Sequence, residues 1–314
     1  MTETFLSAVT AVCPMILLLA LGWHAGRMHY IDEDLSKKLS TVIIRFSQPF
    51  LLFNAVATME YSDEGLRSGG ETVLIALGSH VLLALYAHFA VKYERDKGLR
   101  KVTECAVIFA NVGFIGLPIM QTMLGDIGRF WCGFYIVAFN LCLWSYGITI
   151  YARGRTDIHM NLRKAVLNFG TVPCLLGVVF YVLRITLPTV VASAVNMMAN
   201  MCTPLILLVI GSNLSRQKAR ELFGNPKMYL LSALRLLVPP VFISLLFHLC
   251  GMPDDRVVFF GIMAGIPTAA MTALFAEQYD EHPGFASCAV SMTTVLSMIT
   301  IPVSALLIGW IVQI

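Results

Sequence analysis

Apolar stretches of about 20 residues, separated by short charged segments, follow one another along the whole chain. A helix rises about 1.5 Å per residue, so about 20 apolar residues cross the roughly 30 Å of hydrocarbon in a bilayer. The pattern predicts ten spans, with connecting segments too short to form a soluble domain. The predicted fold class is therefore an all-α membrane protein with ten transmembrane helices. The spans cover residues 5–26, 38–58, 71–92, 103–124, 129–152, 165–186, 189–213, 227–250, 256–278 and 284–312.

Composition agrees with the pattern, because only 13% of the 314 residues are charged and the mean hydropathy is +0.76. A soluble domain carries about 25% charged residues. The 8 cysteines form no CxxC pair, which favours neither a disulfide framework nor a metal site. Motifs of metalloproteases, P-loop proteins and serine hydrolases do not occur in the sequence. We therefore expect no enzyme, no cofactor and no nucleic-acid partner; the expected surroundings are the lipid bilayer.

The basic residues predict the orientation of the chain. Sixteen of the 22 Lys and Arg residues fall in four loops on one side of the predicted spans, and four fall on the other side. Loops rich in Lys and Arg stay in the cytoplasm. The expected location is the inner membrane, with both termini outside the cytoplasm. Loop 277–282 fits poorly, because it belongs to the cytoplasmic side and holds neither Lys nor Arg.

Five spans in each half make the second half enter the membrane from the opposite side, so any repeat must be inverted. Three prolines in the first half have counterparts at nearly constant offsets of about 150–160 residues, as an inverted repeat requires. Chance is the alternative explanation, because proline is common in membrane helices. We expect two five-helix repeats, 1–152 and 165–314. The matching prolines are Pro14 and Pro173, Pro49 and Pro204, and Pro118 and Pro267.

Two predicted spans contain helix-breaking residues at matching positions. Span 4 holds Asn111-Val-Gly113-Phe-Ile-Gly116-Leu-Pro118, and span 9 holds Gly265-Ile-Pro267-Thr268. Glycine permits unusual backbone angles and proline removes an N–H group, so both segments are expected to unwind. Unwound backbone is tolerated at membrane depth only against protein or a watery cavity.

Interrupted helices in both halves of a repeat indicate a transporter's binding site. The N-terminus of a half-helix carries partial positive charge and free N–H groups, which attract carboxylates. A proline kink or close glycine packing between helices remains the structural alternative.

Other polar residues within the predicted spans are candidates for the same site, because such residues are costly unless paired or facing water. Arg45 is open between substrate contact and structural anchor, whereas Arg235 favours a structural role. His80 and His88 favour packing over proton relay. Plausible hydrogen-bond partners for a carboxylate, besides Asn111, are Gln48, Asn140 and Thr203.

Acidic residues give no clear site for a coupling ion. The predicted spans hold no pair of Asp residues at mid-membrane, and Glu277, near a span end, is taken as the acid within them. Coupling to H⁺ or Na⁺, or no coupling, is therefore left open.

Four segments together resemble the auxin efflux carrier family. Asn111-x-Gly113-x-x-Gly116-x-Pro118 is similar to its fourth span, and Gly265-Ile-Pro267-Thr268 to its ninth. The segments Thr203-Pro204-Leu-Ile-Leu-Leu-Val-Ile-Gly211-Ser-Asn-Leu214 and Arg235-Leu-Leu-Val-Pro239 resemble its seventh and eighth spans. No one segment decides the resemblance; their order and spacing do.

The resemblance implies two inverted five-helix repeats with crossing broken helices 4 and 9, a scaffold and a transport domain, and a homodimer. It also implies a crossover site at Asn111 and Pro118 with Pro267 and its neighbours. Plant members carry a long loop between spans 5 and 6, which is short here. The chain is thus similar to bacterial malate or malonate permeases, which makes a small dicarboxylate the expected substrate. The bile-acid sodium symporter family shares the architecture, but its sodium-site acids have no evident match here.

The predicted function is secondary active transport of a small organic anion by alternating access, with an elevator-like movement. The expected substrate-binding residues are Asn111, Gly113, Gly116, Pro118, Gly265, Pro267, Thr268, Gln48, Arg45, Asn140 and Thr203. A cation-coupled carrier similar to the bile-acid symporters, or a cation/proton exchanger of the same architecture, is the alternative. A membrane enzyme and a ligand sensor are disfavoured.

Overall fold

The structure is a computed structural model that describes residues 2–154 and 167–313. Throughout this part of the chain the regular structure is helical. The helices, three short π-helical turns (η) included, are α1 (Thr2–Arg27), α2 (Glu33–Val42), η1 (Ile43–Ser47), α3 (Gln48–Ala57), α4 (Asp63–Ala90), α5 (Lys97–Ile108), η2 (Val112–Gly116), α6 (Leu117–Cys142), η3 (Leu143–Gly147), α7 (Ile148–Ala152), α9 (Thr171–Val182), α10 (Thr189–Arg216), α11 (Ala219–Phe223), α12 (Pro226–Leu236), α13 (Val238–Leu249), α14 (Asp254–Gly265), α15 (Ala270–Gln278) and α16 (Pro283–Ile311).

Seven helical stretches of the described chain are long and apolar enough to cross a membrane by length and composition. They are Glu3–Arg27, Glu33–Ala57, Asp63–Ala90, Val112–Ala152, Thr189–Arg216, Pro226–Leu249 and Pro283–Ile311. The chain is therefore a multi-pass membrane protein. The 41-residue stretch is interrupted at Gly125, whose φ of +66° suits glycine, between the predicted spans 103–124 and 129–152. The start of the predicted span 165–186 and the basic residues Arg155, Arg163 and Lys164 lie outside the described residues.

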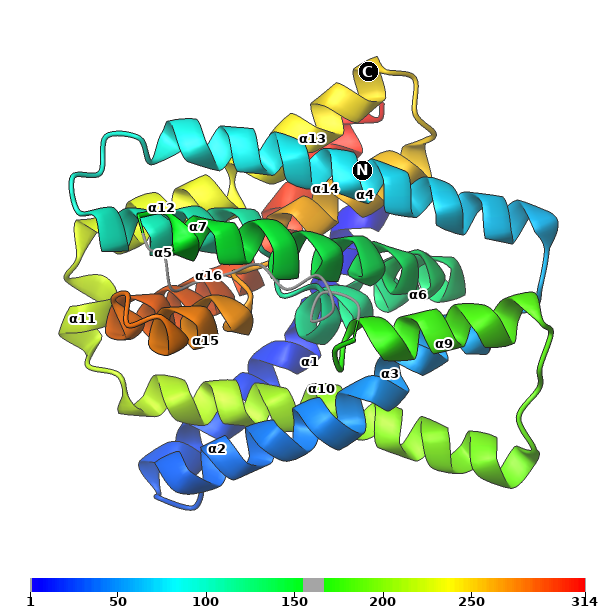
Figure 1. Cartoon of the computed structure of the whole chain (residues 1–314), viewed down its shortest axis with the longest axis horizontal. Helices are drawn as coiled ribbons and strands as arrows, with labels where there is room; N and C mark the ends of the chain where they lie inside the picture. The colour runs from blue at the N-terminus through cyan, green and yellow to red at the C-terminus, as the bar shows by residue number, and fades with distance from the viewer. Residues whose placement is uncertain (1, 155–166, 314) are drawn as a thin grey trace.

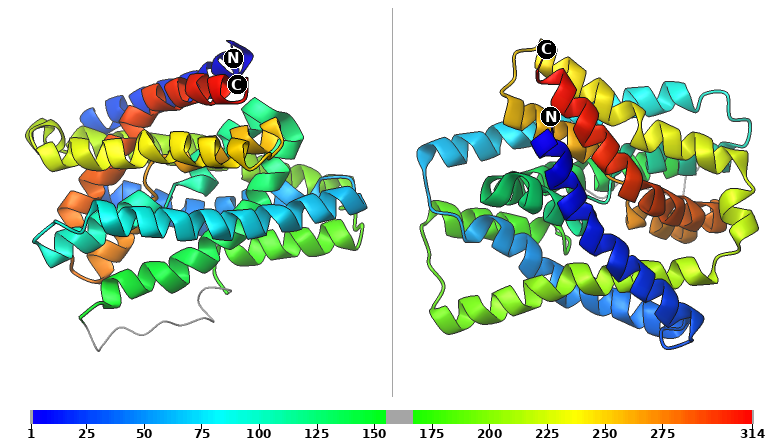
Figure 2. Two further views of the ribbon diagram at one scale, coloured as in Figure 1. Left: turned by 90° about the horizontal axis from the view of Figure 1, so that it is seen from above. Right: turned by 180° about the vertical axis from the view of Figure 1, so that it is seen from behind.

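The helices form two groups, which are joined by α1 and by the contacts of α6 with α3 and α9 (Figures 1 and 2). In one group α3 packs between α9 and α10, and α2 packs on α10. In the other, α4 packs on α5 and α6, and α16 contacts α5 and each helix from α12 to α15. Helix α1 lies against α10 of the first group and α16 of the second. We call these the α10 group and the α16 group.

Small residues allow the close contact of α1 with α10. A Cβ atom on Gly22 would lie 2.3 Å from the carbonyl oxygen of Leu208, and one on Gly211 would lie 2.2 Å from that of Leu19. Backbones approach this closely in membranes only where side chains are absent or small. The two glycines therefore fix α1 against α10.

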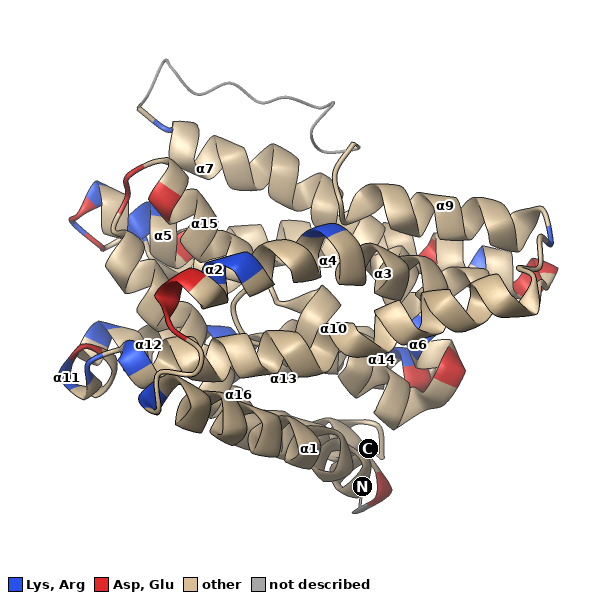
Figure 3. Ribbon diagram, turned by 90° about the horizontal axis from the view of Figure 1, so that it is seen from below, with Lys and Arg blue, Asp and Glu red and all other residues tan. Residues whose placement is uncertain are grey.

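Charged residues gather at the two ends of the helix bundle, with few between them (Figure 3). We call the end that holds the connections 28–32, 91–96 and 217–225 the basic end. The connections 58–62, 183–188 and 250–253 lie towards the opposite end (Figure 2). Polar N-caps start helices at the basic end: Asp32 accepts from the backbone N–H of Leu35 at 2.8 Å, and Asp96 caps α5 in the same way.

Candidate functional site

Two helices are broken near the middle of the bundle, and the breaks face each other. One break separates α5 from η2 at residues 109–111, and the other separates α14 from α15 at residues 266–269. The backbone N–H of Asn111 donates to the carbonyl of Pro267 at 2.8 Å, and that of Ala269 donates to the carbonyl of Phe109 at 2.9 Å. These bonds form a short antiparallel bridge that satisfies backbone groups which lipid could not.

The first break lies upstream of the position that the sequence predicts. The sequence predicts unwinding over residues 111–118, but residues 112–116 form η2, and Leu117 and Pro118 begin α6. Pro118 directly follows the π-helical turn, in which the N–H of Leu117 bonds to the carbonyl of Val112, so the wider turn carries the chain past the proline, which has no N–H to donate. The unwound residues are 109–111, so Pro118 and Pro267 do not occupy equivalent places, although Gly265 and Pro267 do lie at the second break as predicted.

Arg235 on α12 joins the two half-helices that end at the breaks. Its side chain is 0% exposed, and its guanidinium donates to the carbonyls of Val107 and Ile266, both at 2.9 Å. The C-terminus of a helix leaves carbonyls without partners and carries partial negative charge. Arg235 therefore compensates both ends at once, a structural role.

Thr268, a predicted binding residue, forms its hydrogen bonds within the protein. Its hydroxyl donates to the carbonyl of Ala106 at 3.0 Å, and its backbone N–H donates to the hydroxyl of Thr293 on α16 at 3.2 Å. The side chain is 0% exposed. Thr268 thus fastens the second break to α5 and α16.

Asn111 differs, because its side-chain amide nitrogen is buried and has no hydrogen-bond partner. The residue is 4% exposed and lines a cavity of about 190 Å³. The cavity leads towards the basic end, where Asn213 and Ser287 in its wall are exposed. The lining residues are Ser40, Asn111, Ile206, Val209, Ile210, Asn213, Ala270, Ala273, Ser287, Val290 and Ser291. A buried donor without a partner at the inner end of a cavity is a candidate ligand contact.

Three further predicted residues lie around the first break. A Cβ on Gly113 would meet the side-chain nitrogen of Gln48 at 3.4 Å, so Gln48 lies against η2. Gly116 packs beside Met263 of α14, where a Cβ would lie 3.2 Å from the sulfur. At the second break a Cβ on Gly265 would lie 3.3 Å from the ring of Pro240.

Arg45, Asn140 and Thr203 line no part of the Asn111 cavity. Arg45 is exposed and borders a separate hollow of about 410 Å³ beside Pro49 and Pro173. The amide of Asn140 donates to the carbonyl of Ile136 within its own helix at 3.0 Å. Thr203 is half-buried on α10.

Glu104 corrects the prediction that Glu277 is the acid of the spans. It lies within the predicted span 103–124, is 0% exposed, and accepts from Arg153 at 2.9 Å and from Tyr146 at 3.2 Å. Nearby, Lys101 and Glu281 form an ion pair of 2.7 Å. Both pairs hold α5 at the basic end. Counting acids span by span finds Glu104, but not its partner across 49 residues.

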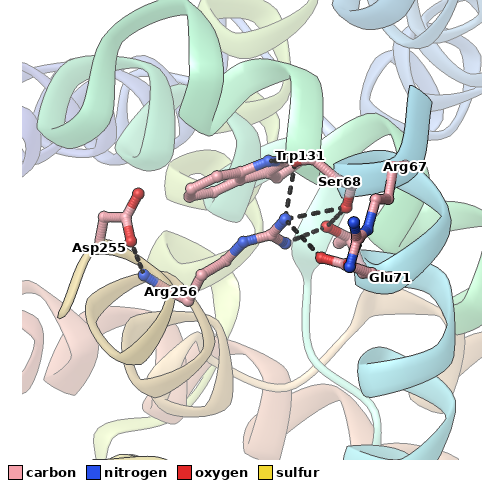
Figure 4. A network of polar contacts seen from close by, with 7 residues as sticks. Arg67, Ser68, Glu71, Trp131, Asp255 and Arg256 are labelled. Carbon is pink, nitrogen blue, oxygen red and sulfur yellow. Dashed lines mark hydrogen bonds and ion pairs between the residues drawn. The ribbon is translucent and has the colours of Figure 1, made fainter. Parts of the chain in front are cut away.

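Arg256 holds the start of α14 at the opposite end of the bundle (Figure 4). Its guanidinium lies 4.1 Å from the ring centre of Trp131 and donates to the hydroxyl of Ser68 at 2.7 Å. Trp131 donates to the same hydroxyl, and Glu71 lies 3.8 Å from the guanidinium. The broken helices are thus anchored at both outer ends while they meet in the middle.

Comparison with known proteins identifies the family of the chain. Residues 7–305 match the family described as "Membrane transport protein". The chain belongs to this family. A relative of this membrane transport protein occurs in Methanothermobacter thermautotrophicus and is described as an "Uncharacterized transporter". It is 23% identical over 304 residues, which cover 95% of this chain and 97% of the relative. The predicted resemblance to the auxin efflux carriers is confirmed at the level of the family.

Proposed function

We propose that this membrane transport protein carries a small organic anion, a dicarboxylate such as malate or malonate, across the inner membrane. A carboxylate would bind at Asn111. The observation that carries the proposal is Asn111 itself, which lines a cavity beside two helix breaks and whose buried side-chain nitrogen has no partner.

Helix-end electrostatics support an anion at this place. Asn111 immediately precedes η2, and Ala270, the first residue of α15, lines the same cavity. The N-termini of two half-helices therefore lie beside the cavity, where their free N–H groups and partial positive charge favour a carboxylate.

The proposed mechanism is alternating access. The proposed topology has ten membrane crossings, arranged as two inverted five-helix repeats (1–152 and 165–314), with both termini outside the cytoplasm. The breaks meet like those of crossing helices 4 and 9. The Asn111 cavity leads towards the basic end, which the distribution of Lys and Arg favours as cytoplasmic. The structure would then be the inward-facing state. In the elevator-like movement, the α16 group would slide as the transport domain against the α10 group, the scaffold of a homodimer.

The test is uptake of labelled malate, malonate and acetate into proteoliposomes, with and without Na⁺ or pH gradients. We expect uptake of at least one of these anions, and its strong reduction in Asn111→Ala at matched expression. Asn196→Ala is the matched control, because Asn196 bonds to Asn54 away from the cavity. Wild-type uptake by Asn111→Ala would remove Asn111 from the site, and uptake of none of the anions would contradict the proposed function.

The same assay tests the alternatives, a cation-coupled carrier or a cation/proton exchanger. An exchanger needs an acid that can bind the cation, whereas Glu104 is paired with Arg153. Proton or sodium flux without any carboxylate would favour the exchanger.

A further inference from the structure

The cavity at Asn111 has a second polar region nearer the basic end. Its polar side chains there are Ser40 on α2, Asn213 on α10, and Ser287 and Ser291 on α16. All four are uncharged, as is every other residue that lines this cavity. An anion in this region would therefore depend on neutral donors, and the direction in which each donor points decides whether it can bind.

Arg216 fixes the direction of Asn213. Its guanidinium donates to the side-chain oxygen of Asn213, to the carbonyl of Ile31 at 2.9 Å, and to the hydroxyls of Ser212 at 2.7 Å and Ser36 at 2.9 Å. A guanidinium only donates hydrogen bonds, so it must hold the oxygen of the Asn213 amide. The NH₂ group of Asn213 is then the part left for the cavity.

Gln217 acts in the same way on the two serines. Its side-chain nitrogen donates to the hydroxyl of Ser291 at 2.8 Å and to that of Ser287 at 3.2 Å. Each hydroxyl accepts through a lone pair and keeps its own hydrogen to donate. Arg216 and Gln217, at the end of α10, thus bond to the acceptor atoms of Asn213 and the two serines and leave the donors of these side chains for the cavity.

We propose that Asn213, Ser287 and Ser291 form a second carboxylate site, so that the cavity selects compact dicarboxylates. One carboxylate lies at Asn111 and the other at Asn213 and the serines. The inference rests on the proposed function and gives that site its specificity. Arg216 and Gln217 are positioning residues, because they orient the donors.

Size and position agree with such a ligand. Pockets for drug-sized ligands measure about 300–1,000 Å³, whereas this cavity measures about 190 Å³. A chain of a few carbons between two carboxylates suits the smaller volume. Asn111 belongs to a broken helix of the α16 group and Asn213 to α10, so a dicarboxylate would bridge the two groups of helices.

Asn213→Asp tests the second site with little change in shape. The new carboxylate still accepts from Arg216, but it replaces the NH₂ donor by an oxygen that repels a carboxylate. We expect the ratio of malonate uptake to acetate uptake to fall at least tenfold relative to the wild type. The matched control is Asn225→Asp, because Asn225 caps α12 at the basic end and Asp serves equally well as a cap; its ratio stays at the wild-type value.

Arg216 variants test positioning. Arg216→Met should lower the same ratio by a similar factor, and Arg216→Lys, which retains a charged donor, should restore part of it. Ser291→Ala removes one donor without touching Arg216, and serves if an Arg216 variant fails to fold. For Ser291→Ala we expect the ratio of malonate uptake to acetate uptake to fall threefold to tenfold.

The outcomes separate this inference from the proposed function. A wild-type ratio in Asn213→Asp and Ser291→Ala overturns the second carboxylate site, and so does a wild-type protein that carries acetate but not malonate or malate. A wild-type protein that carries none of the three contradicts the proposed function itself.

Discussion

The two helix breaks are built alike but leave different chemistry behind. At the second break the hydroxyl of Thr268 is bonded to α5, and its N–H to α16. At the first break the backbone of Asn111 is bonded, but its buried side-chain nitrogen has no partner, and the residue lines a cavity. Under the proposed function, the first break binds the substrate and the second supports the fold.

Arg235→Ala should destabilise both helix breaks at once, so it gives the largest expected effect. It removes the donors to two buried carbonyls, one at each break. Each unsatisfied carbonyl costs about 1–3 kcal/mol, so the free energy of unfolding should fall by about 2–6 kcal/mol. Thermal unfolding in detergent measures the loss, and Arg235→Lys should recover part of it. An unchanged melting temperature would contradict the structural role.

Asn111→Ala should separate binding from stability. A hydrogen bond to a charged group is worth about 1.5–3 kcal/mol, which corresponds to roughly a tenfold to hundredfold loss of affinity. The melting temperature should hardly change, because the amide nitrogen has no partner in the protein. Ligand binding and thermal unfolding of the same preparation measure the two effects. A large loss of stability without a loss of affinity would show that Asn111 supports the fold and does not bind the substrate.

Thr268→Val should show the opposite behaviour at a smaller scale. It keeps the shape of the side chain and removes the bond to Ala106. One such bond in a membrane protein contributes about 0.6–1 kcal/mol to stability. We expect a lower melting temperature with substrate affinity within a factor of about three of the wild type. A loss of affinity as large as that of Asn111→Ala would show that both breaks contribute equally to substrate binding.

Alanine at the break glycines should give effects of about the same size as Thr268→Val. At Gly265 the new methyl meets the rigid ring of Pro240 at 3.3 Å, whereas at Gly113 it meets the flexible end of Gln48 at 3.4 Å. Crowding against a rigid neighbour costs more, so Gly265→Ala should be the less stable by about 1 kcal/mol. Paired melting curves test the order of the two variants.

Much of the membrane embedding could be predicted from the sequence, because apolar length and loop charge act locally along the chain. The helix break at Gly265 and Pro267 was predicted in place. The first break was not, because Gly113, Gly116 and Pro118 all tolerate the start of a helix as well as its interruption. Which of these happens depends on the carbonyl of Pro267, about 150 residues away, pairing with Asn111.

The candidate site was predicted only in part. Of the eleven residues predicted to bind the substrate, Asn111 lines the cavity and the other ten do not. Asn213 lies inside segment 203–214, which carries the family resemblance, but it is not among the predicted binding residues. Its proposed role depends on Arg216, whose partners outside α10 lie on α2 and the connection before it.

The sequence by itself determined that the chain crosses a membrane repeatedly, that two helices are interrupted, and that polar groups are available at the interruptions. Hydrophobicity, glycine and proline act on their own neighbourhood, so these features can be read from the sequence. The tertiary structure alone decided which polar groups stay unpaired. Thr268 finds partners on α5 and α16, whereas the side-chain nitrogen of Asn111 finds none, because the groups that could pair with them come from helices distant in sequence.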